Sequence, residues 1–203
     1  MGEVERRALV LAGGRATRFG SDKLRALERG RSLLDHAIAS AAPHVDRVTV
    51  VLGPDGEVPP LPAGVEVVRD AEAALGPLAG LATGLAVAGD EERVLLVAGD
   101  MPEAASGVLA LLLAALDTAP LAALGEEPDD RPRPLPLACA AGAVRPAVAE
   151  LLAAGERRLR AVLEVAPLAV VPAARWTPLD PGRGTLRDVD RPEDLRPDPR
   201  REG

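Results

Sequence analysis

Glycines and basic side chains gather in one short segment near the start of the chain, LAGGRATRFGSDK. Gly13 and Gly14 let backbone amides approach phosphate oxygens closely. Positive charge for a polyanion comes from three side chains of the same segment, Arg15, Arg18 and Lys23. The pattern predicts a polyphosphate site; the alternative is an ordinary turn whose charges are solvated.

Two common nucleotide-binding motifs do not fit this segment. A Walker A loop ends in Gly-Lys-Ser or Gly-Lys-Thr, and the dinucleotide motif reads G-x-G-x-x-G. The segment contains neither pattern. The predicted site therefore belongs to another class of phosphate-binding loop.

Two carboxylates follow apolar runs further along the chain. Asp100 comes after RVLLVAG, at the expected carboxyl edge of a strand, where open α/β sheets hold their ligands. Mg²⁺ that bridges phosphates needs a few hard carboxylate oxygens, so Asp100 is a candidate ligand. The alternative is that Asp100 caps the next helix. Asp70 closes the run VEVV and precedes a Gly-Pro helix start, where an anion or a base could lie.

Strands and helices must position these residues, and the sequence shows short apolar runs that alternate with helical patterns. We expect strands at 7–12, 47–52, 65–68 and 93–99, and helices at 32–42, 78–88 and 104–118. The alternation predicts an α/β fold with a mostly parallel central sheet that is covered by helices on both faces.

The second half of the chain gives a weaker pattern. The polar, proline-rich stretch GEEPDDRPRP at 125–134 predicts a surface loop. We expect the core to resume in four segments, the apolar run 135–141, a helix at 144–154, a short helix through LRAVLEV and a strand at 168–171. One domain over 1–196 and a disordered tail at 197–203 are predicted.

Composition limits the possible functions. The chain has 203 residues, 47% of them hydrophobic, and a net charge of −7, which argues against nucleic acid as a partner. The longest apolar stretch, Val108 to Leu116, is too short for a membrane span, so we expect a cytoplasmic protein. Cys139 is expected to be a buried thiol. His36 and His44 are expected to be structural residues without partners.

The glycine-rich segment resembles the signature of the MobA-like NTP transferases, above all the molybdenum cofactor guanylyltransferases. The pattern L-A-G-G-x-x-x-R-x-G-x-D-K is matched at every fixed position, and the family also has the Asp with G-P-L-x-G and the D-x-P pattern. The resemblance implies a Rossmann-like three-layer α/β/α nucleotidyltransferase fold. It implies nucleotide contacts by Leu11, Ala12, Gly13, Gly14, Lys23, Asp70, Gly76, Pro77, Leu78, Gly80 and Asp100. It also implies catalytic roles for Arg18, Lys23 and Asp100.

Two further segments resemble the same family. In TLRDVDRPEDL, Asp188 and Asp190 occupy positions where the family has asparagines, and alternation puts both on one face of an extended stretch. Asp190 could join Asp100 as a Mg²⁺ ligand, or it could cap a helix that begins at Pro192. The stretch AGERR implies acceptor contacts by Arg157 and Arg158; the alternative is a solvated helix face.

The resemblance implies an activity and its partners. The substrates would be GTP and molybdopterin, with Mg²⁺ as cofactor, and the products would be the guanine dinucleotide cofactor and pyrophosphate. Transient contact with other cofactor-assembly proteins or molybdoenzymes is expected, without nucleic acid or membrane. Two alternatives stay open: a relative that uses CTP or another small phosphorylated acceptor, and a silent adaptor that binds nucleotide or pterin without turnover.

Overall fold

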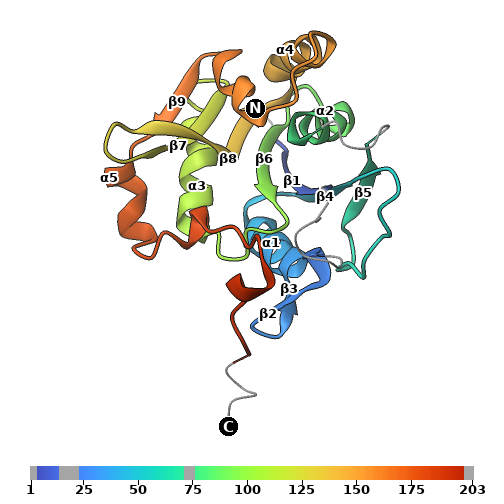
Figure 1. Ribbon diagram of the computed structural model, residues 1–203. Helices are drawn as coiled ribbons and strands as arrows, with labels where there is room; N and C mark the ends of the chain where they lie inside the picture. The colour runs from blue at the N-terminus through green and yellow to red at the C-terminus, as the bar shows by residue number, and fades with distance from the viewer. Residues whose placement is uncertain (1–3, 14–22, 71–75, 199–203) are drawn as a thin grey trace.

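Seven strands form the central sheet in the computed structural model, which describes residues 4–13, 23–70 and 76–198 (Figure 1). The strand order is β5-β4-β1-β6-β8-β7-β9; β8 is antiparallel to both neighbours, and the other pairs are parallel. The strands are β1 (Arg6–Ala12), β4 (Arg47–Leu52), β5 (Glu66–Arg69), β6 (Arg93–Ala98), β7 (Leu121–Glu126), β8 (Arg131–Ala140) and β9 (Leu168–Val171). A separate hairpin pairs β2 (Leu27–Glu28) with β3 (Arg31–Ser32).

Helices cover both faces of the sheet because its strands are apolar on both sides. One face carries α1 (Leu33–Ala41), α3 (Ser106–Ala115) and α5 (Ala173–Trp176). The other carries α2 (Pro77–Val87), α4 (Ala141–Ala153) and the 3-10 helix η3 (Leu159–Glu164). In β1, Ala8 and Val10 pack into the first layer and Leu9 into the second. The predicted three-layer α/β/α architecture is confirmed.

The region predicted as a surface loop, 125–134, contains the ends of two strands, so that prediction holds only for the turn at 127–130 and was wrong on either side of it. β7 continues to Glu126, and β8 begins at Arg131 after a tight turn. The prolines of β8 alternate at Pro132, Pro134 and Pro136, whereas its pairing with β6 begins only at Leu137. Proline is tolerated where one side of a strand needs no amide donor, which explains how this stretch can belong to a sheet.

Smaller differences concern helices and histidines. The short helix expected through LRAVLEV is η3, a 3-10 helix that ends at Glu164, and α4 begins three residues earlier than expected. His36 Nε2 lies 2.7 Å from the Glu28 carbonyl, and His44 Nε2 lies 2.9 Å from Ser106 Oγ, so both histidines have partners, contrary to expectation. No helix in the described part of the chain combines the length and apolarity needed to cross a bilayer.

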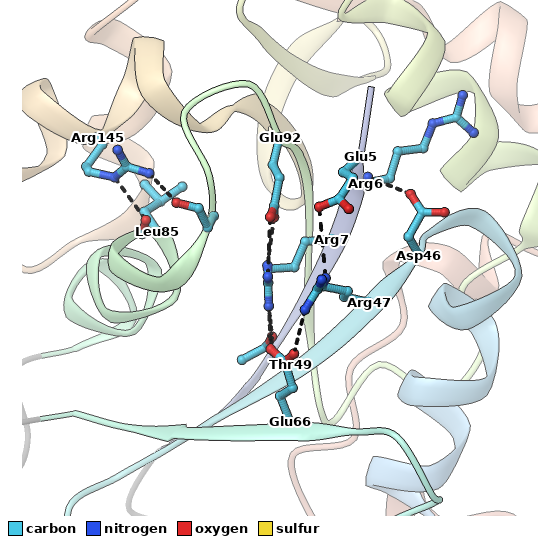
Figure 2. Close-up of polar contacts among 11 residues, drawn as sticks. Glu5, Arg6, Arg7, Asp46, Arg47, Thr49, Glu66, Leu85, Glu92 and Arg145 are labelled. Carbon is cyan, nitrogen blue, oxygen red and sulfur yellow. Dashed lines mark hydrogen bonds and ion pairs between the residues drawn. The ribbon is translucent and has the colours of Figure 1, made fainter. Parts of the chain in front are cut away.

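A buried ionic network closes the amino end of the sheet (Figure 2). Arg7 on β1 is 4% exposed, and its guanidinium donates to Glu92 Oε2 at 2.7 Å, Thr49 Oγ1 at 2.7 Å and Glu66 Oε2 at 2.5 Å. These partners come from β4, β5 and the turn before β6. A buried charge requires such pairing. The network therefore ties the parallel strands together at the edge opposite their carboxyl ends.

Candidate functional site

Lys23, Asp100 and Asp190 meet at the carboxyl end of β6. Lys23 Nζ lies 2.8 Å from Asp100 Oδ2 and 3.0 Å from Asp190 Oδ1. The lysine side chain is 13% exposed, against 27% for Asp100 and 58% for Asp190. The sequence placed these residues as cation and carboxylates of one site, and the structure brings all three together.

Three segments of chain hold this group in place. Lys23 begins the 3-10 helix η1 (Lys23–Arg25), and Asp100 follows β6, where Gly99 N donates to Leu11 O at 2.8 Å. Asp190 belongs to the C-terminal segment, residues 187–196, which runs below the sheet in the view of Figure 1. That segment docks on the Asp100 loop because Val189 N donates to Asp100 O at 3.0 Å. Residues 167 positions apart, Lys23 and Asp190, thereby become neighbours.

The charge of Lys23 is stabilised by its two partners. Burial works against the ammonium group, but hydrogen bonds and charge attraction from Asp100 and Asp190 outweigh it and raise the pKa of Lys23 above its usual value. Lys23 is therefore protonated at neutral pH. A protonated amine beside two carboxylates is a group that can pass its hydrogen bonds to an incoming phosphate.

A second part of the site surrounds Asp70, which follows β5. Asp70 Oδ1 is buried, and within the described part of the chain it has no hydrogen-bond partner. A Cβ added to Gly80 would lie 3.9 Å from Asp70 Oδ2 and 3.0 Å from Leu11 Cδ2, so these three residues are packed together. A buried acceptor of this kind is costly unless a donor reaches it. Asp70 can therefore receive a donor from a ligand.

Close backbone approaches account for two of the predicted glycines. A Cβ on Gly13 would lie 3.0 Å from Gly53 N, and one on Gly76 would lie 2.8 Å from Arg157 O. Gly76 also has φ +81°, a conformation that side chains disfavour. It precedes Pro77 at the first turn of α2, and Leu78 after it is buried in the core. These glycines let neighbouring loops meet at the strand ends.

The predicted acceptor residues lie beside the Gly76 turn rather than at the Lys23 group. The backbone of Arg157 contacts Gly76, and its side chain is exposed, donating to Glu156 O at 2.9 Å. Arg158 is 83% exposed and forms an ion pair with Glu156 at 2.8 Å. Hydrogen bonds from Arg158 and Arg157 lower the pKa of Glu156 to about 2. The structure does not assign these arginines a ligand.

Gly14 and Arg18 lie outside the described residues. The helix-capping alternative for Asp190 was wrong: Arg191 is the N-cap of η6 (Pro192–Asp194), and Asp194 Oδ2 accepts from Asp190 N at 3.0 Å and Arg191 N at 2.8 Å. Sequence reasoning also missed the pair of Glu28 and Arg187, which lies beneath the site.

The fold and site together define an α/β nucleotide-binding protein of the nucleotidyltransferase type: parallel strands in the order β5-β4-β1-β6, with a lysine and carboxylates beyond their carboxyl ends. Residues 8–171 match the family model of the MobA-like NTP transferase domain. The chain belongs to this family.

Similar proteins support the same assignment. A probable molybdenum cofactor guanylyltransferase of Chloroflexus aggregans is 34% identical, over 93% of this chain and 90% of that protein. Another, of Deinococcus radiodurans, is 38% identical over 93% of this chain and 91% of that protein. The crystal structure of molybdopterin-guanine dinucleotide biosynthesis protein A from Archaeoglobus fulgidus superposes with a TM-score of 0.74 at 20% identity, covering 93% of this chain and 94% of that one. The structural likeness shows a shared fold.

Proposed function

We propose that this protein transfers GMP from GTP to molybdopterin, forming the guanine dinucleotide cofactor and pyrophosphate in the cytoplasm. The observation that carries the proposal is the group of Lys23, Asp100 and Asp190 at the carboxyl end of the parallel strands. The guanylyltransferase names of relatives that match over nine-tenths of the chain supply the nucleotide and the acceptor.

The reaction needs positioning and charge rather than a protein nucleophile. The acceptor phosphate attacks the α-phosphorus in line, and pyrophosphate leaves, so catalysis depends on orientation and on neutralising phosphate charge. Lys23 is the described cation that lies nearest Asp100, and Arg18 from the glycine-rich segment would add a second charge. Asp70 Oδ1, buried without a partner among the described residues, would accept a hydrogen bond from the nucleoside.

Mg²⁺ fits the donor chemistry of this site. The described residues contain no cluster of three or more acidic, histidine or cysteine side chains arranged for a metal. Mg²⁺ commonly uses only one or two carboxylates and takes its other ligands from phosphate and water. Asp100 and Asp190, which already share one cation, would hold it. When bound, Mg²⁺ would neutralise charge on the triphosphate.

The proposed acceptor contacts adjoin the Gly76 turn of the nucleotide pocket. Arg157 and Arg158 remain proposed acceptor contacts, because their exposed guanidinium groups can meet an anionic pterin phosphate. In the structure the Arg158 guanidinium donates to the Glu156 carboxylate, and the Arg157 guanidinium donates to the Glu156 carbonyl, so an acceptor would have to share or replace these partners.

Pyrophosphate release tests the proposal directly. Purified protein with Mg²⁺ and molybdopterin is given GTP, CTP, ATP or UTP at equal concentration, and release with GTP alone is the expected result. Preference for CTP would reject the guanine assignment, and GTP binding without turnover would favour a silent adaptor.

A matched pair of variants tests the site. Asp100→Asn should lower kcat by about 10²- to 10³-fold, the usual cost of losing one electrostatic contact to the transition state. Asp46→Asn is the control, because Asp46 accepts from Arg6 N at 2.8 Å near the opposite end of the sheet. Equal activity in both variants would remove Asp100 from the proposed machinery.

A further inference from the structure

A buried carboxylate lies beneath the site and has no place in the chemistry proposed above. Glu28 on β2 is 1% exposed. It accepts hydrogen bonds from Arg196 N at 2.7 Å and from Arg187 Nη1 at 3.0 Å. Both donors belong to the C-terminal segment that carries Asp190, so one side chain joins two distant parts of the chain.

Because the Glu28 carboxylate is buried, its contacts with Arg187 and the Arg196 amide strongly favour the docked position of the C-terminal segment. Desolvation alone would raise the pKa of Glu28, but the hydrogen bonds from Arg196 N and Arg187 outweigh it and lower the pKa. Glu28 is therefore ionised at neutral pH, and a buried charge that loses its partners is costly. The C-terminal segment must stay docked for the charge of Glu28 to be satisfied.

Other contacts make the same junction rigid. Arg29 N donates to Arg196 O at 2.9 Å, and the Glu28 carbonyl is 2.7 Å from His36 Nε2 on α1. Val189, which is fully buried, packs against Leu33 at the start of α1. The hairpin, α1 and the C-terminal segment thus form one packed unit.

The position of this junction in the sequence relates it to the site. Glu28 comes five residues after Lys23, and Arg187 comes three residues before Asp190. Between Arg187 and Asp190, Val189 N holds the segment to Asp100 O at 3.0 Å. The two chain pieces that supply Lys23 and Asp190 are therefore fastened to each other just outside the site.

We propose that Glu28 is a positioning residue: through Arg187 and the Arg196 amide it holds the C-terminal segment so that Asp190 stays against Lys23 and Asp100. Its predicted effect on turnover rests on the proposed function, whereas its effect on the geometry of the site does not.

The sequence offers a selective probe for this geometry. Lys23 is the sole lysine among the 203 residues, so protein labelled with ¹³C-lysine has one lysine side-chain signal. The ¹³Cε chemical shift and relaxation of Lys23 report whether its ammonium group is held by Asp100 and Asp190. The measurement needs no nucleotide, metal or acceptor.

Three variants are compared with the wild type. Asp190→Asn gives the reference signal for a Lys23 side chain that has lost its second charged partner. Glu28→Gln should shift the Lys23 signal in the same direction and increase its mobility. Glu92→Gln is the matched control, because Glu92 is also a buried carboxylate paired with an arginine but lies in the network of Figure 2. It should leave the Lys23 signal unchanged.

Kinetics add a second readout. Glu28→Gln should lower kcat for pyrophosphate release by about 10- to 100-fold, as for partners that orient the residues around a metal. KM for GTP should change by less than kcat, because Leu11, Gly13 and Asp70 are untouched. Glu92→Gln should retain wild-type kcat although it also lowers stability.

The outcomes separate the two proposals. A wild-type Lys23 signal in folded Glu28→Gln would overturn the positioning role, as would an equal loss of kcat in Glu92→Gln. If Glu28→Gln does not fold, Arg187→Gln, in which the changed side chain is 17% exposed, replaces it with the same expectations. If the wild type transfers no nucleotide but Glu28→Gln still moves the Lys23 signal, the proposed function fails and the positioning role stands.

Discussion

Replacing Lys23 by methionine should separate catalysis from stability. The change keeps an unbranched side chain as far as Cε and removes the ammonium group that lies 2.8 Å from Asp100 and 3.0 Å from Asp190. The two carboxylates then face each other without the shared cation. We expect kcat to fall far more than the free energy of unfolding, because the ion pair is partly exposed whereas the ammonium group would face the charge of the transition state.

We expect a small loss of stability and a large loss of kcat. Ion pairs with partly exposed partners contribute about 1 kcal/mol or less, and Asp190 is 58% exposed, so the free energy of unfolding should fall by about 1 kcal/mol. A cation that meets charge developing in the transition state contributes about 10²- to 10³-fold in kcat. The pKa of Lys23 is raised in the folded state, so its stabilising effect is complete below the usual lysine pKa and is lost only as the pH rises through the raised value.

Unfolding and turnover of Lys23→Met can be measured on the same sample. The single tryptophan, Trp176, is fully buried, so its fluorescence follows urea unfolding, and pyrophosphate release with GTP follows turnover. Lys23→Arg is the control for charge; it should unfold like the wild type and recover part of the activity, because a guanidinium group has a different donor geometry. Turnover of Lys23→Met within threefold of the wild type, or a loss of stability above about 3 kcal/mol, would refute the catalytic reading.

Four other predictions concern the core. Arg7→Met should lower the free energy of unfolding by about 3–5 kcal/mol in urea titrations, because it leaves the buried carboxylate of Glu92 unpaired. Burial opposes the charge of Glu92, but Arg7 lowers its pKa, so wild-type stability should fall as the pH drops through that lowered value; in Arg7→Met this acid sensitivity should weaken. Gly84→Ala should destabilise by about 1–3 kcal/mol in the same titration, since the new Cβ would overlap the fully buried side chain of Leu9. Cys139 should not react with a thiol reagent until the protein unfolds, because burial raises its pKa to about 12.

The parallel half of the fold could be predicted because its signals are local. β4 and β9 have the bounds expected from their apolar runs, and α1 begins after Ser32, whose side chain accepts from Asp35 N at 3.0 Å. The end of β7 and the first part of β8 were predicted as a loop because proline and charge in one stretch also indicate a loop. The proline-rich part of β8 can be a strand because β6 does not pair with it. That depends on how distant segments pack, which the local sequence does not report.

The site shows the same limit. Lys23 and Asp100 could be predicted because each follows a strand-like run or a glycine-rich turn, which places it at the carboxyl edge. The pairing of Glu28 with Arg187 could not, because they are 159 residues apart and nothing in the pattern of TLRDVDRPEDL, which contains Arg187, points to Glu28. A buried ion pair is specified by the packing of segments around it, and no local signal reports that packing.

The two ends of the sheet carry different tasks, and their separation has a measurable consequence. β1 spans seven residues, so about 20 Å lies between the Arg7 network and the turn at Gly13. Changes that far apart with no shared partner should add. Glu92→Gln should therefore lower the stability of Asp100→Asn by the amount it takes from the wild type and should leave the remaining turnover unchanged. A large coupling in either quantity would mean that the Arg7 network reaches the site through β1 and β6, and the two ends could then no longer be treated as independent.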